Sequence, residues 1–193
     1  IQSWTNINLS EAGHLHAEAV RSGQIWRAIT ALTLHGDLGH IFSNSLFGAL
    51  FGLFVGRHLG SGLGWLLVLG CGAIANLTNA WIQPDAFRAV GASTATFAAL
   101  GLVPAFAWRR GYFRGNGLKR GFAPIFAAIC ILSYTGFGSE RVDVGGHVFG
   151  FTYGIIAGLL FAEINLKARS LGDQQRAGIM AIIVVSTAWL VAI

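Results

Sequence analysis

The sequence predicts an all-α polytopic membrane protein built as a helical bundle. Only 11% of the residues are charged, whereas 54% are hydrophobic, and the mean hydropathy is +0.61. Soluble domains carry about 25% charged residues, so these values indicate a chain that lies mostly in lipid. The 27 glycines agree with this prediction, because packed membrane helices tolerate glycine inside apolar segments.

Six apolar segments are long enough to cross a bilayer, which takes about 20 residues. They are 38–56, 62–82, 92–108, 121–137, 144–163 and 177–193. We expect four units: an extramembrane or interfacial segment (1–37), a membrane core (38–163), an inner basic loop (164–176) and an additional transmembrane helix (177–193). The first residue is Ile1 and no signal peptide follows it, so we expect a fragment of a longer protein.

The charges in the loops predict the orientation of these segments. If 1–37 lies outside, nine basic residues fall in inner loops and four fall outside. The inner ones are Arg57, Arg109, Arg110, Arg114, Lys119, Arg120, Lys167, Arg169 and Arg176; the outer ones are Arg21, Arg27, Arg88 and Arg141. This excess agrees with the positive-inside rule. It places the first residues of 38–56, 92–108 and 144–163 near the outer surface.

A serine and a histidine stand at the outer ends of two segments. Ser93 follows Gly91-Ala92 at the start of 92–108, and His147 lies near the start of 144–163. Serine becomes a nucleophile when a base takes its proton, and histidine is the usual base. Similar depth allows the hydrogen bond that such a pair needs. The alternative is that both are ordinary polar residues of a helical bundle.

The segment that carries His147 also predicts a close neighbour. It has one glycine every four residues: Gly146, Gly150, Gly154 and Gly158. Small residues at this spacing let another backbone approach. His147 points into the same sector of the helix surface as these glycines. The stripe could equally serve packing alone. Asp143, one turn before His147, is a candidate third member of a triad, although capping the helix or facing solvent is favoured.

A third polar cluster is a candidate oxyanion-binding site. His40 and Asn44 are four residues apart and so share one helix face, and both can donate hydrogen bonds to a tetrahedral oxyanion. A polar patch with no catalytic role is the alternative. Metal binding by His35 and His40 is disfavoured, because a spacing of five does not align them on a helix. His14, His16 and His58 look like interfacial or loop residues without a partner, and Cys71 and Cys130 like inert apolar residues.

Together these residues resemble the rhomboid family of intramembrane serine proteases, from Trp26 to about Gly158. Trp26-Arg27 resembles the family's Trp-Arg pair in its first outer loop. The other matching motifs are H-x4-H-x3-N (His35, His40, Asn44), G-x-S (Gly91-Ala92-Ser93) and the base-bearing helix (Gly146-His147-Val148-Phe149-Gly150, then Gly154).

The resemblance implies that Ser93 is the nucleophile and His147 the general base. The backbone N–H of Ser93 and the side chains of His40 and Asn44 would form the oxyanion hole. The supporting residues would be His35, Gly91, Thr94, Gly146 and Gly150. The family needs no metal or other cofactor. The implied partners are single-pass transmembrane substrates in the lipid bilayer and no nucleic acid. The implied location is the cell (inner) membrane, as an integral multi-pass protein with the active site facing outside.

The chain departs from the family pattern at several places. Thr94 stands where the motif usually has a second glycine, so a catalytically weak or inactive rhomboid-like protein that binds membrane clients is the alternative function. Gly56 occupies the place of a frequent glutamate. We expect the given sequence to lack the family's first helix and 177–193 to be an extra C-terminal helix. An unrelated transporter or channel would predict charged residues in mid-segment, where almost none occur.

Overall fold

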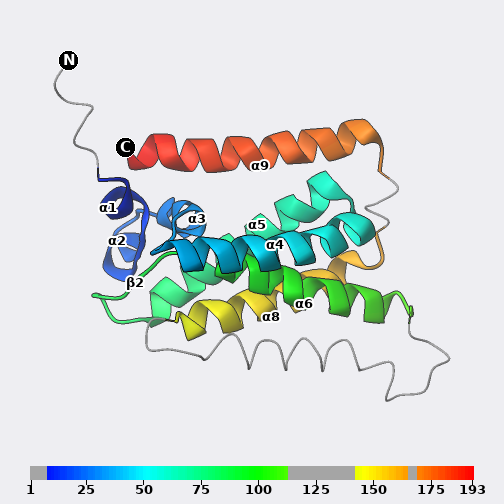
Figure 1. Cartoon of the computed structure of the whole chain (residues 1–193), viewed down its shortest axis with the longest axis horizontal. Helices are drawn as coiled ribbons and strands as arrows, with labels where there is room; N and C mark the ends of the chain where they lie inside the picture. Colours follow the sequence, from blue (N-terminus) through cyan, green and yellow to red (C-terminus); the bar gives the residue numbers. More distant parts are fainter. Residues whose placement is uncertain (1–7, 113–141, 165–168) are drawn as a thin grey trace.

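The computed structural model describes residues 8–112, 142–164 and 169–193, and the predicted segment 121–137 lies outside them. The described elements are α1 (Leu9–Gly13), β1 (Leu15–His16), α2 (Ala17–Arg21), α3 (Arg27–Thr30), the 3₁₀ helix η1 (Ala31–Thr33), α4 (Leu38–Leu59), α5 (Ser61–Ile82), β2 (Arg88–Ala89), α6 (Ser93–Arg109), α8 (Val144–Phe161) and α9 (Leu171–Ala192). The protein is an all-α membrane protein, as the sequence predicts, with one two-stranded ribbon among these elements (Figure 1).

Four of the described helices are long and apolar enough to cross a membrane: α4, α5, α8 and α9. The segment predicted at 92–108 forms α6, which has 17 residues and packs against α4, α5 and α8. The predicted count of six spans stays a prediction, because 121–137 is outside the described residues. The division of the chain into four units also stays a prediction.

Helix α9 begins at Leu171, earlier than the apolar run at 177. The Ser170 side chain accepts a hydrogen bond from the Asp173 N–H and so caps the helix. The first turns of α9 are polar, with Asp173, Gln174 and Gln175. Hydropathy alone therefore could not detect this part of the helix.

Among the described helices, α6 and α8 make the most extensive contact. An added β-carbon at Gly150, Gly154 or Gly158 of α8 would overlap a backbone carbonyl oxygen of α6. Gly101 of α6 shows the same relationship to the Phe151 carbonyl. The predicted close neighbour of the glycine stripe is therefore confirmed, and it is the helix that begins with Ser93.

Residues 8–34, which we call the end segment, fold over one end of the bundle. Strand β1 pairs antiparallel with β2, with Leu15 opposite Ala89 and His16 opposite Arg88. The Arg21 guanidinium donates to the Ala80 and Gln83 carbonyls and also pairs with Asp85. These contacts connect the end segment to the last turn of α5 and to the loop between α5 and α6. We call this end of the bundle the pocket end, because the cavity described below lies there.

Candidate active site

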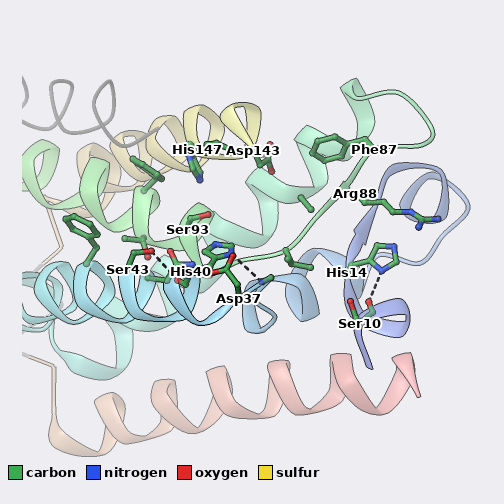
Figure 2. Close-up of a pocket in the computed structure, with 18 of the residues that line it drawn as sticks. Ser10, His14, Asp37, His40, Ser43, Phe87, Arg88, Ser93, Asp143 and His147 are labelled. Carbon is green, nitrogen blue, oxygen red and sulfur yellow. Dashed lines mark hydrogen bonds between the residues drawn. The ribbon is translucent and has the colours of Figure 1, made fainter. Parts of the chain in front are cut away.

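A cavity of about 1110 Å³ lies at the pocket end, among the end segment, α4, β2, α6 and α8. Its walls contain the four candidate catalytic residues: Ser93, His147, His40 and Asn44. In the view of Figure 2, Ser93 stands between His147 on one side and His40 on the other. The fold therefore brings together residues that are more than 100 positions apart in the sequence.

The turn before Ser93 explains how the His40 ring comes to lie near this residue. Gly91 has a φ of +137°, which is strained for any residue with a side chain. A β-carbon at Gly91 would lie 2.7 Å from Cε1 and Nε2 of His40 and 3.4 Å from Oγ of Ser93. Only a glycine here lets the His40 ring stand beside the turn that carries Ser93.

The hydrogen bonding of His40 indicates which ring nitrogen carries the proton. Nδ1 of His40 accepts from the Gly36 N–H at 3.4 Å. A neutral imidazole that accepts at one nitrogen donates at the other, so Nε2 is the donor. Nε2 and the adjacent Cε1 are also the ring atoms that face the turn at Gly91.

Asn44 supplies a second donor. Its side chain is 8% exposed, and its Nδ2 is buried with no hydrogen-bond partner among the described residues. A buried donor without a partner is costly, so it indicates a catalytic role or an acceptor such as a bound water or ion. The side chain lines the cavity, so a bound acceptor can reach it.

His147 lies in the first turn of α8 and is 6% exposed. Its ring packs on Phe97, with 4.2 Å between the ring centroids. Phe97 is one helical turn after Ser93 and shares its face of α6. The His147 ring thus lies against the face of α6 that carries Ser93.

Asp143 caps α8, as the sequence analysis favoured. Its Oδ1 accepts from the Gly146 N–H at 2.9 Å, and its two carboxylate oxygens accept from Asn79 Nδ2 at 2.8 and 3.0 Å. Burial raises the pKa of the Asp143 carboxyl above its usual value, although the hydrogen bonds from Gly146 and Asn79 oppose the shift.

Thr94 is buried between the two helices, with 3% exposure. Its Oγ1 would lie 3.0 Å from a β-carbon on Gly146, and its Cγ2 would lie 3.4 Å from one on Gly150. Thr94 is absent from the cavity walls. Its side chain therefore fills the contact between α6 and α8 and leaves the cavity next to Ser93 open.

His14 and His58 were predicted to have no partner, and this prediction is wrong for both. The His58 ring packs on Phe106 and Tyr112. His14 is buried, lines the cavity and has its Nδ1 at 2.7 Å from the Ser10 carbonyl oxygen. Burial lowers the pKa of His14. Arg27 holds this region by donating to the carbonyls of Glu11 and His14. The resemblance of Trp26-Arg27 to the family's Trp-Arg pair was the one sequence feature that pointed to this arrangement of the end segment.

Within residues 8–112, 142–164 and 169–193, no group of three or more His, Cys, Asp or Glu side chains could hold a metal ion. His35 and His40 pack edge to face, with 5.1 Å between their centroids.

The fold and the cavity define a class of protein: a helical membrane protein with a serine, histidines and an amide around one cavity. Comparison with known proteins gives the family. A family model described as "Rhomboid domain" matches residues 22–164. The chain therefore belongs to the rhomboid family.

Relatives of this chain carry protease names. It is 31% identical over 151 residues to Rhomboid-like protease 2 of Toxoplasma gondii. This match covers 76% of this chain and 51% of that protein. It is 27% identical over 144 residues to putative rhomboid protease YdcA of Bacillus subtilis, covering 75% and 71% of the two chains. It is 29% identical over 166 residues to rhomboid protease GluP of Bacillus subtilis, covering 84% and 31%. The chain thus spans about half the length of the first of these relatives. At the level of the family, these names support an intramembrane protease.

Proposed function

We propose that the protein is a serine endopeptidase that cleaves transmembrane segments of membrane proteins by a Ser93–His147 dyad. The observation that carries the proposal is the single cavity whose walls include Ser93, His147, His40 and Asn44. The protease names of its relatives support the same reaction class.

In the proposed reaction, Oγ of Ser93 attacks the scissile carbonyl carbon while His147 takes the hydroxyl proton. The carbonyl oxygen becomes an oxyanion, which accepts hydrogen bonds from the Ser93 backbone N–H, His40 Nε2 and Asn44 Nδ2. Collapse of the tetrahedral intermediate breaks the C–N bond, and His147 gives its proton to the leaving amine. Water then attacks the acyl-enzyme with His147 again as the base, which releases the second product and restores Ser93.

A dyad suits the surroundings of His147 better than a triad. The Asp143 carboxylate is already used by Gly146 and Asn79, so these bonds compete with any role in orienting His147. Packing against Phe97 supplies an alternative means of holding the ring. Asp143 then influences the site indirectly, because it caps the first turn of α8, which carries His147.

The proposed substrates are single-pass membrane proteins whose helix unwinds near the pocket end. The cavity combines polar residues with Phe47, Phe51 and Phe97, so it can hold apolar substrate side chains beside a hydrated reaction centre. Polar groups at membrane depth are tolerated where they line such a cavity. The loop charges support an orientation with the pocket end outside the cell (inner) membrane.

Cleavage of a reporter transmembrane substrate in liposomes tests the proposal. Ser93→Ala is expected to abolish cleavage, and Ser43→Ala, at another hydroxyl in the cavity wall, is expected to retain it. A fluorophosphonate probe should label wild-type Ser93 and should fail to label His147→Ala. Reporter cleavage by Ser93→Ala, or a wild-type serine that never reacts, would refute the protease and favour a client-binding protein.

A further inference from the structure

Helix α9 lies outside the region that the family model matches, which ends at residue 164. It packs along α5 and also contacts α3 and α1. Figure 1 shows α9 running the length of the bundle, with its C-terminal end beside α1 and α3. The proposed reaction assigns no role to this helix.

Near its N-terminus, α9 is held on α5 by the side chain of Gln174. Oε1 of Gln174 accepts from the backbone N–H groups of Gly62 and Leu63, each at 3.0 Å. These donors belong to the first turn of α5, where backbone N–H groups have no partner within the helix. The contact holds the first turn of α5 against α9, where Gly62 also lies against the Gln174 backbone.

At the other end, Trp189 contacts the end segment. Its Nε1–H donates to Thr33 Oγ1 at 3.0 Å, and its ring fills the space that a β-carbon on Gly13 would need. Thr33 Oγ1 in turn donates to the Thr30 carbonyl at 2.8 Å, and Thr30 Oγ1 donates to the Gly13 carbonyl at 2.7 Å. The indole therefore completes a set of contacts around α3 and η1.

The same short helix η1 holds the turn before Ser93. The Gly91 N–H donates to the Ala31 carbonyl at 2.9 Å, and Ala31 and Thr33 are the two ends of η1. Gly91 is the residue that fits between His40 and Ser93. A continuous path of contacts thus runs from Trp189 through Thr33 and η1 to the Ser93 turn.

We propose that Trp189 is a positioning residue for the active site: by holding η1 through Thr33, it sets the Gly91 turn and hence the place of Ser93 relative to His40. This inference rests on the proposed protease function. It gives α9 a role beyond crossing the membrane. A displacement of about 1 Å at a reacting group can cost up to about a hundredfold in rate, so a small movement of η1 would be measurable.

The test uses the full chain in liposomes, with three single variants and one double variant. Trp189→Phe keeps an aromatic ring and removes the indole N–H, and Thr33→Val removes the hydroxyl that accepts it. Trp81→Phe is the matched control, because Trp81 lies in another membrane-spanning helix and is 65% exposed. The double variant Trp189→Phe/Thr33→Val shows whether the two losses are one interaction.

We expect kcat for the reporter, and the rate of fluorophosphonate labelling, to fall on the order of tenfold in Trp189→Phe with KM unchanged. The double variant should be no slower than Thr33→Val alone, and Trp81→Phe should match the wild type. A lower unfolding temperature with unchanged kcat would overturn the inference, since it would leave α9 with a stabilising role alone.

A second measurement does not depend on activity. Hydrogen–deuterium exchange over residues 85–93 should be several-fold faster in Trp189→Phe than in the wild type, because the Gly91 N–H loses its fixed acceptor. Unchanged exchange there would overturn the positioning role even in an active enzyme. If the wild type is neither labelled nor active but the exchange increases, the proposed function fails while the structural link from Trp189 to Gly91 holds.

Discussion

The backbone carbonyl oxygen of Thr94 occupies the space that a side chain at Gly150 would need. Helices α6 and α8 therefore touch at the level of the candidate dyad, one residue after Ser93 and three residues after His147. This contact shows where Thr94 packs, at the position where the family motif usually has a second glycine. Thr94 belongs to the interface between the two helices, whereas its neighbour Ser93 belongs to the cavity.

Replacing Thr94 tests this assignment. Thr94→Gly should lower the free energy of unfolding by about 1–2 kcal/mol, because it leaves a void between α6 and α8. It should give no gain in kcat. The free energy of unfolding of Thr94→Ser should lie between those of the wild type and Thr94→Gly. Unfolding in mild detergent and reporter cleavage measure both effects. A large rise in kcat in Thr94→Gly would mean that the threonine restricts the site after all.

The glycine stripe of α8 predicts a second effect. Gly154→Ala should destabilise the protein by about 1–3 kcal/mol, because its methyl group would overlap the Ala98 carbonyl and push α8 away from α6. Labelling of Ser93 should also slow, since α8 carries His147. The control is Gly70→Ala in α5, where an added β-carbon has nothing within 4 Å. Equal effects of the two changes would contradict the packing argument.

Gly91→Ala should lower kcat by about 10²–10³-fold, the usual cost of losing an oxyanion donor, because the methyl group displaces the His40 ring. Gly23→Ala separates this effect from backbone strain. Gly23 also has a positive φ, +101°, but nothing within 4 Å of an added β-carbon. It should cost stability and leave kcat unchanged. Reporter kinetics and detergent unfolding on both variants make the comparison.

Asp143 offers a test of the dyad against a triad. Asp143→Asn should keep kcat within about tenfold of the wild type, because an amide oxygen can still accept from the Gly146 N–H. A carboxylate that orients a catalytic histidine costs about 10⁴-fold when changed to asparagine. A loss of that size would assign Asp143 to a triad. Asp143→Ala removes the cap and should cost about 1 kcal/mol of stability.

Protonation of the end segment should make the protein less stable in mild acid. Burial lowers the pKa of His14 below 6.5, and the charge of Arg27 acts in the same direction. The unfolded chain therefore binds a proton first, so the free energy of unfolding decreases as pH falls from about 6.5 to the folded-state pKa. His14→Gln should reduce this slope in unfolding curves between pH 7.5 and 5.

His35 should account for part of the slope that remains in His14→Gln. Burial lowers its pKa too, and His40 adds to the shift. The double variant His14→Gln/His35→Gln should therefore be flatter still. An unchanged slope in both variants would show that neither histidine is held neutral by the fold.

Much of the helical frame was predictable because hydropathy and glycine spacing are local properties. The observed α4, α5, α6 and α8 agree with the predicted apolar segments to within a few residues. The prediction was less accurate for α9, whose first turn is stabilised by the Ser170 cap. It was also incomplete for residues 8–34, where short helices and a two-residue strand depend on contacts with the loop before Ser93.

The sequence by itself identified the candidate catalytic residues Ser93, His147, His40 and Asn44 and the helix ends on which they stand. These features follow from residue type and spacing along one helix. The tertiary structure alone decided their surroundings: Thr94 faces α8, Asp143 bonds to Asn79, His14 enters the cavity wall and Trp189 reaches Thr33. Each of these contacts joins residues from different elements. A side chain's direction relative to another helix depends on how the helices cross, which no single segment specifies.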